Sequence, residues 1–100
     1  MGAVVTVIIP AYNAAKYLAE AVESVLRQSE KRFELWIVDD NSIDNTVEIA
    51  EQYTYDGRVR VYKNNRNMGL AKLLNHYHAM VETPFTARMD SDDVMFENRL

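Results

Sequence analysis

Four short apolar segments alternate with helix-like segments along the chain, and this alternation limits the fold more than any other feature. Val4–Ile9 and Phe33–Val38 are rich in β-branched and other large apolar residues, as expected of strands buried on both faces. Arg58–Lys63 alternates charged and apolar residues, which predicts a third, less buried strand, and Phe85–Met89 predicts a fourth. Because strand–helix–strand connections are right-handed, such a chain forms a parallel sheet covered by helices. The predicted fold class is α/β, a Rossmann-like, mainly parallel sheet flanked by helices.

Between these strands, apolar residues recur every three or four positions, the spacing of one helical face. Pro10 is expected to end the first strand, and Asn13 to cap the first helix. Gly69 is expected to permit a tight turn before the third helix. The inward stripe of that helix is predicted to be Leu70, Leu73, Leu74, Tyr77 and Val81. The predicted helices are Ala14–Gln28, Asp44–Tyr53 (with Val47, Ala50 and Tyr53 inward), Leu70–Val81 and a helix beginning in Phe96–Leu100.

Length and composition are those of an ordinary globular chain. Its 100 residues, 48% of them hydrophobic, suit one small domain or a piece of a larger one. The absence of cysteine excludes disulfides and thiolate metal sites, and no apolar run approaches the roughly 18 residues of a membrane span. A net charge of −4 without a basic cluster argues against nucleic-acid binding. An acidic chain that binds a phosphorylated ligand needs a cation or a few placed Arg and Lys residues.

Polar clusters follow all four predicted strands. Ligands of open parallel sheets bind at the carboxyl ends of the strands, which meet at one edge. We therefore expect a binding site at this edge, before any family is considered. The clusters are Tyr12-Asn13, Asp39-Asp40, Asn64–Asn67 and Asp90–Asp93.

The acidic cluster Asp90-Ser91-Asp92-Asp93 places three carboxylates within four residues, where they repel one another unless a cation or proton intervenes. Oxygen ligands of this kind favour Mg²⁺ or Mn²⁺ over zinc. An acidic turn that caps the next helix is the alternative. The position at the end of a strand, beside a second acidic pair, favours the metal.

The pair Asp39-Asp40 also follows a buried strand, where an acid commonly hydrogen-bonds the ribose or base of a nucleotide. Capping of the second helix is the alternative, but Ser42 and Asp44 stand closer to that helix. One member of the pair is expected to be structural, and the sequence leaves open which. Tyr12 is expected either to stack on a base or to pack as a lid on the core.

Arg66, Lys72 and Arg88 are candidate counter-charges for a diphosphate. His76 and His78 stand two positions apart on a helix, which is poor spacing for metal ligands, so we expect both to be structural or exposed. The chain contains neither G-x-G-x-x-G after the first strand nor G-x-x-x-x-G-K-[ST]. These absences exclude a dinucleotide fingerprint and a P-loop, and they fit a diphosphate neutralised by a metal.

Ordered segments of the chain resemble the signatures of family 2 glycosyltransferases of the A-type fold. The resemblance covers essentially all of the chain. It rests on VTVIIPAYN at Val5–Asn13, ESVLRQ at Glu23–Gln28, FELWIVDDNSIDNT at Phe33–Thr46, NMGLAKLLN at Asn67–Asn75 and ARMDSDDVMFENRL at Ala87–Leu100.

The resemblance implies a nucleotide-sugar donor, a UDP-sugar or another, bound with Mn²⁺ or Mg²⁺. Tyr12 and the Pro10-Ala11 main chain would flank the base, and Asp40 rather than Asp39 would read the uracil ring. Asp90-Ser91-Asp92 corresponds to the family's D-x-D element. Asp92 would be the main metal contact, Asp90 would reach the ribose or sugar beside it, and Asp93 would support the loop.

The resemblance further implies inverting transfer of a hexose-type sugar to a glycan, lipid or polysaccharide acceptor. It also implies a cytoplasmic enzyme whose parent protein associates peripherally with the inner face of a membrane. Residues 1–100 would form the nucleotide-sugar-binding subdomain, with the acceptor region and general base beyond Leu100. We therefore assign no catalytic base.

Three alternatives remain open at this point. In the first, the chain is a donor-binding fragment without transfer activity. Asp90–Val94 formally fits the D-x-D-x-[TV] motif of a Mg²⁺-dependent phosphatase, with Asp90 as nucleophile, but that motif normally follows the first strand of the domain. A receiver-like module could use Asp39-Asp40 as its acidic pocket, yet this pair follows the second strand instead of the first.

Overall fold

A 4-stranded parallel sheet forms the centre of the molecule, and this confirms the predicted fold class. The computed structural model describes residues 2–95 and 99–100. The strands lie in the order β3-β2-β1-β4. They are β1 (Val5–Ala11), β2 (Phe33–Asp39), β3 (Val59–Lys63) and β4 (Phe85–Arg88).

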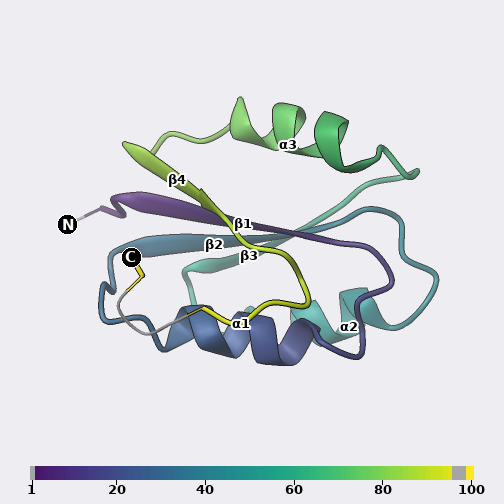
Figure 1. Ribbon diagram of the computed structural model, residues 1–100, viewed down its shortest axis with the longest axis horizontal. Coiled ribbons are helices and arrows are strands. Elements are labelled where there is room, and N and C mark those ends of the chain that lie inside the picture. The colour runs from purple at the N-terminus through teal and green to yellow at the C-terminus, as the bar shows by residue number, and fades with distance from the viewer. Residues whose placement is uncertain (1, 96–98) are drawn as a thin grey trace.

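Helices cover both faces of this sheet. Figure 1 shows α1 (Leu18–Leu26) and α2 (Thr46–Glu51) below it and α3 (Leu70–His78) above it. On the α1 side, Val7 and Ile9 of β1 pack with Leu18 and Val22 of α1 in the larger core. On the α3 side, a smaller core joins Ile8, Trp36 and Val38 of the sheet to Leu73 and Tyr77 of α3. No helix within the described residues is long and apolar enough to cross a membrane.

Side chains of β2 alternate strictly between these two cores. Leu35 and Ile37 belong to the α1 side, whereas Trp36 and Val38 belong to the α3 side. Because successive side chains of a strand point to opposite faces, Asp39 continues toward α1 and α2, and Asp40 toward α3. The two neighbouring aspartates therefore lie on different faces of the sheet.

Pro10 does not end the first strand, as the sequence analysis expected, because β1 runs on to Ala11. The Ile8 carbonyl accepts a hydrogen bond from the Met89 N–H, so alternate residues of β1, including residue 10, present their main chain toward β4. β4 pairs only with Val5–Ile8 and has ended by this point. The missing N–H of the proline therefore costs no hydrogen bond between strands. A sheet tolerates proline at such positions.

The predicted Asn13 cap is also wrong, since α1 begins at Leu18 and has no side-chain cap. Asn13 instead adopts a left-handed conformation with φ 49°, and its side chain contacts another loop. The other helices are shorter than predicted: α2 lacks both ends of its predicted range, and α3 stops at His78. Leu70 belongs to no core and is 48% exposed. The predicted helix starting in Phe96–Leu100 falls largely on 96–98, outside the described residues.

Beyond β4 the chain turns back along α1 (Figure 1). Met89 and Met95 are both buried in the larger core. The Met95 N–H donates to the Ser24 hydroxyl of α1 at 2.9 Å. These contacts fix both ends of the acidic segment Asp90–Asp93, which bridges β4 and α1.

Candidate functional site: a crevice between β1 and β4

A crevice lies between β1 and β4, where the order of the strands in the sheet reverses. From β1 the chain proceeds to β2 and β3 on one side, and α3 then returns it to β4 on the other. Such a switch point is where open α/β sheets bind ligands. β1 extends three residues past its last partner in β4, so the two strands part at their carboxyl ends. The crevice has a volume of about 220 Å³ and is lined by Pro10, Ala11, Tyr12, Asp40, Leu70, Leu73 and Ser91.

The loops after β1 and β2 are joined by four hydrogen bonds that make one wall of this edge rigid. The Asn13 N–H donates to the Ser42 hydroxyl at 2.8 Å, and the Asn13 side-chain oxygen accepts from the Ile43 N–H at 3.0 Å. Deeper in, the Ala14 N–H donates to the buried Thr46 hydroxyl at 2.9 Å. The fourth bond joins the Ala15 N–H to the Asp44 carboxylate at 3.2 Å.

Asp40 ties the loop after β3 to this framework. Its Oδ1 accepts from the Asn64 side-chain amide at 2.9 Å and from the Met68 N–H at 2.8 Å. Its Oδ2 accepts from the Gly69 N–H at 3.0 Å. The side chain of Asn67 reaches the Asp40 main-chain carbonyl at 3.4 Å. A carboxylate has about four acceptor positions, so one position on Oδ2 has no donor among the described residues, and Asp40 itself lines the crevice.

Gly69 makes this arrangement possible. Its φ of 81° and ψ of 156° fall in a region of backbone conformation that is essentially restricted to glycine. The conformation starts α3 and directs the Gly69 N–H to Asp40. The sequence analysis expected a tight turn here; the structure shows instead a glycine-specific conformation at the start of α3, with Gly69 outside any turn.

We expect Gly69→Ala to lower the free energy of unfolding by about 1–3 kcal/mol, because alanine does not tolerate this conformation. An added Cβ would meet no atom within 4 Å, so the cost arises from the backbone alone. Urea denaturation measures it. Gly57→Ala is the matched control, since Gly57 has equally open surroundings and no positive φ. Equal stability of the two variants would contradict the explanation.

Asp39 points to the opposite face from Asp40 and does not line the crevice. Its Oδ2 accepts from the Ser42 N–H at 3.1 Å, which fixes the loop after β2. Its Oδ1 is buried and has no hydrogen-bond partner within the described parts of the chain. The contacts of Asp39 are thus those of a loop support, whereas Asp40 reaches the candidate site.

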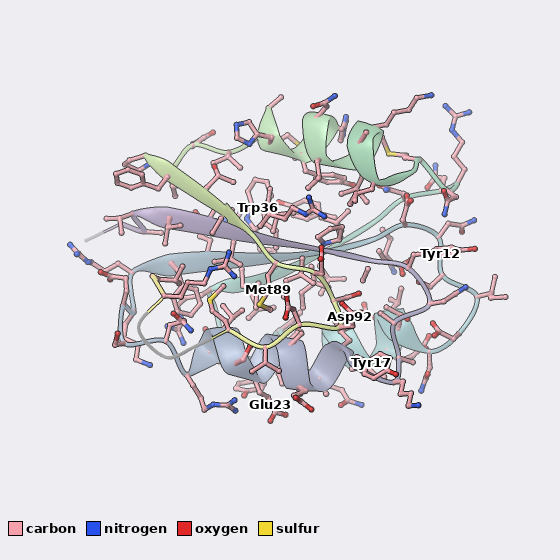
Figure 2. All side chains as sticks on the ribbon, viewed as in Figure 1. Tyr12, Tyr17, Glu23, Trp36, Met89 and Asp92 are labelled. Atoms are coloured by element: carbon pink, nitrogen blue, oxygen red, sulfur yellow. The ribbon has the colours of Figure 1, made fainter. Side chains whose placement is uncertain are left out.

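Tyr12 and Leu70 form apolar walls of the crevice. They are 53% and 48% exposed, so both present apolar surface to a ligand in the crevice. Figure 2 shows Tyr12 at the carboxyl end of β1, and it belongs to neither core, which favours the stacking alternative over a lid on the core. The sequence analysis missed Leu70 and Ser91 as lining residues. The position of Leu70 directly after a glycine, at the first residue of α3, was the available signal.

The acidic segment lies beside the crevice but its carboxylates do not converge. Asp90 pairs with Arg88 at 3.0 Å, and the Asp93 carboxylate accepts from the Val94 N–H. Asp92 is exposed and makes no hydrogen bond or ion pair with the described part of the chain (Figure 2). Among residues 2–95 and 99–100, no group of three or more acidic or histidine side chains forms a ready metal cage.

These carboxylates nevertheless fit a divalent ion that takes few of its ligands from the protein. Mg²⁺ and Mn²⁺ commonly use only one or two protein carboxylates and complete their shells with water and substrate phosphates. Asp92 offers unengaged oxygen donors, and its neighbour Ser91 lines the crevice. Asp90 has one oxygen engaged by Arg88. The donor set suits an ion that arrives with a phosphorylated ligand.

The other predicted contacts lie apart from the crevice. Arg66 borders a separate hollow with Lys63 and Met68, and Lys72 is an exposed residue of α3 that is not part of the lining. Arg88 is paired with Asp90. His76 and His78 are both exposed, as expected.

A larger hollow of about 310 Å³ lies at the opposite, amino ends of the strands. Its cations are largely neutralised, because Arg32 pairs with Glu30 and Arg58 with Asp56. The Arg58 guanidinium also stacks on Phe33 with its carbon 4.3 Å from the ring centre. Volume alone would favour this hollow, but it is not at the sheet edge where such folds bind ligands.

Comparisons with known proteins identify relatives of this chain. The putative glycosyltransferase EpsE of Bacillus subtilis is 43% identical over 99% of this chain and 36% of its own length. Glycosyltransferase GlyG of Streptococcus pneumoniae is 36% identical over 100% of this chain and 34% of its own length. The chain thus spans about a third of the length of these relatives.

Solved structures share the fold. The crystal structure of Staphylococcus aureus TarS 1-349 in complex with UDP-GlcNAc superposes with a TM-score of 0.86 at 33% identity, over 97% of this chain and 28% of TarS. The mannosyltransferase PcManGT of Pyrobaculum calidifontis, in complex with GDP-Man and Mn²⁺, superposes with a TM-score of 0.84 at 23% identity, over 94% of this chain and 29% of its own. Neither the phosphatase nor the receiver alternative finds support in these likenesses. The model of glycosyl transferase family 2 matches residues 6–100, which is nearly the whole of this chain. The chain therefore belongs to that family of glycosyltransferases.

Proposed function

We propose that the crevice between β1 and β4 binds the nucleotide of a sugar-nucleotide donor, with UDP-sugars as the preferred class, and that the chain is the donor-binding part of an inverting glycosyltransferase. The observation that carries the proposal is the position of Asp40, which brings a free acceptor to a crevice at the switch point of the sheet. TarS, at 33% identity, has been solved with UDP and with UDP-GlcNAc.

The lining of the crevice suits a nucleobase. Tyr12 and Leu70 provide exposed apolar surfaces for the two faces of a flat ring, and Pro10 and Ala11 provide main-chain contacts. Asp40 accepts a hydrogen bond from a ring N–H. The volume of about 220 Å³ is smaller than most whole-ligand pockets, so it takes the base and part of the ribose and leaves the diphosphate and sugar toward Ser91.

The diphosphate would then extend toward Asp92. In our proposal Asp92 is the main protein ligand of Mn²⁺ or Mg²⁺, with Asp90 beside it at the ribose or sugar. When bound, such an ion neutralises the charge that develops on the departing diphosphate. The fixed ends of the segment Asp90–Asp93, at Met89 and Met95, hold these carboxylates beside the crevice. Arg66 and Lys72 are retained only as peripheral counter-charges.

Transfer itself requires more than donor binding. An inverting enzyme needs a base that removes the proton from an acceptor hydroxyl as that oxygen attacks the anomeric carbon and UDP leaves. No described carboxylate has a contact that assigns it this role. We therefore propose that the donor is bound by this chain and that the base and the glycan or lipid acceptor site belong to the part of the relatives that it does not span. A chain that binds UDP without transferring sugar would agree with this division.

The Tyr12→Ala variant is expected to bind UDP roughly 5- to 150-fold more weakly than the wild type, because base–aromatic stacking contributes roughly 1–3 kcal/mol. Calorimetric titration with UDP in the presence of Mn²⁺ measures the change. Tyr17→Ala is the matched control, since Tyr17 is 49% exposed but is not part of the crevice lining (Figure 2). If both variants lost affinity equally, or if the wild type did not bind UDP, the proposal would fail.

A further inference from the structure

A chain of hydrogen bonds leads from the core beneath α3 to the crevice. The Tyr77 hydroxyl contacts the Asn64 side-chain oxygen at 2.6 Å, and the Asn64 amide nitrogen contacts Asp40 Oδ1 at 2.9 Å. Neither Tyr77 nor Asn64 lines the crevice. Their hydrogen bonds reach the crevice through Asp40.

The direction of each bond in this chain is determined. A carboxylate oxygen accepts, so Asn64 must present its NH₂ group to Asp40 and its carbonyl oxygen to Tyr77. The Tyr77 hydroxyl must then donate. Since the main-chain N–H of Asn64 also donates to the Asp39 carbonyl at 2.9 Å, the residue is held at both its backbone and its side chain.

Tyr77 is a firm anchor for this chain. Its side chain is only 6% exposed, and its ring packs against Tyr62, with ring centres 5.3 Å apart, and edge-on against His76 at 4.8 Å. Burial raises the pKa of Tyr77 above its ordinary value, so the hydroxyl keeps the proton that it donates. The far end of the chain is thus fixed in the core while the near end, Asp40, lines the crevice.

We propose that Tyr77 and Asn64 are positioning residues that hold the Asp40 carboxylate with its remaining acceptor toward the bound base, and thereby set base preference. This inference rests on the proposed function. A held carboxylate suits bases that present a ring N–H, such as N3–H of uracil, and opposes cytosine, whose N3 is itself an acceptor. A loosened carboxylate can turn toward the exocyclic amino group of cytosine and loses this discrimination.

The test compares the affinities for UDP and CDP, each measured by calorimetry with Mn²⁺ on the whole chain. The variants are Asn64→Ala and Tyr77→Phe, and Tyr62→Phe serves as control because it removes a hydroxyl from the same aromatic cluster without touching Asp40. We expect wild type and Tyr62→Phe to prefer UDP. Asn64→Ala should reduce the UDP-to-CDP affinity ratio roughly tenfold, the effect of one hydrogen bond to a charged group, and Tyr77→Phe roughly threefold.

A purely structural role would lower both affinities together and leave their ratio unchanged, and that result in folded Tyr77→Phe or Asn64→Ala would overturn the inference. Should Asn64→Ala not fold, the volume-conserving Tyr77→Phe still decides. A wild type that binds UDP and CDP equally would overturn the inference while leaving the nucleotide site in place. A wild type that binds neither would overturn the proposed function as well.

Discussion

Asp40→Asn is expected to weaken UDP binding by roughly 10- to 100-fold and to lower the free energy of unfolding by about 1–3 kcal/mol. The carboxylate accepts from Asn64, Met68 and Gly69, all of them N–H donors. An asparagine must turn its NH₂ group toward one of these donors or toward the base. The substitution therefore leaves a part-buried N–H unsatisfied and replaces the acceptor that would meet the base.

Calorimetry with UDP and Mn²⁺ and urea denaturation together separate the two effects of Asp40→Asn. Asp56→Asn is the matched control, because it makes the same carboxylate-to-amide change at the opposite ends of the strands, where Asp56 pairs with Arg58 at 2.7 Å. We expect the control to retain wild-type UDP affinity. An Asp40→Asn protein that is destabilised but binds UDP normally would show that Asp40 only supports the loop.

Asp92→Ala is expected to abolish most of the Mn²⁺-dependent gain in UDP affinity without changing the fold. Loss of even an outer-shell partner costs a metal site roughly 10–100-fold in affinity, so loss of the main ligand should cost at least as much. Because Asp92 is exposed and makes no hydrogen bond or ion pair with the described residues, the free energy of unfolding should change by less than about 0.5 kcal/mol.

The comparison for Asp92→Ala is UDP titration with Mn²⁺ and with EDTA, for wild type, Asp92→Ala and Asp93→Ala. Asp93 is an equally exposed carboxylate whose visible role is a bond to the Val94 N–H, so its variant should keep the metal response. UDP binding that is indifferent to Mn²⁺ in the wild type would contradict the metal site. Unfolding of Asp92→Ala would mean that the segment is structural.

The sheet and its functional edge follow from the sequence because strand alternation and crossover handedness are dictated locally. β-branched runs, the spacing of the helices and the polar residue after each strand sufficed to predict a candidate site at the carboxyl ends. Alternation along β2 also contains the distinction between Asp39 and Asp40. Asp39 and Asp40 can be assigned to opposite faces of the sheet only once Leu35 and Trp36 are known to face different helices.

Features that depend on where neighbouring segments stop were not predictable. Pro10 remains within β1 because β4 has already ended, which depends on a partner strand whose paired residues lie 80 positions further along the chain. Asn13 looked like a helix cap, yet its hydrogen bonds go to Ser42 and Ile43 on the next loop. The bond from Asn64 to Tyr77 likewise joins a loop to a helix core, and neither residue type signals it in isolation.

Amide chemical-shift mapping on titration with UDP and Mg²⁺ tests the central claim most directly, because it locates the ligand on the chain. We predict that the largest shifts fall on Ala11, Tyr12, Asp40, Leu70 and Ser91, at the parting of β1 and β4. Shifts concentrated around Arg32 and Arg58 at the opposite ends of the strands, or no shifts at millimolar UDP, would contradict a donor site in this crevice.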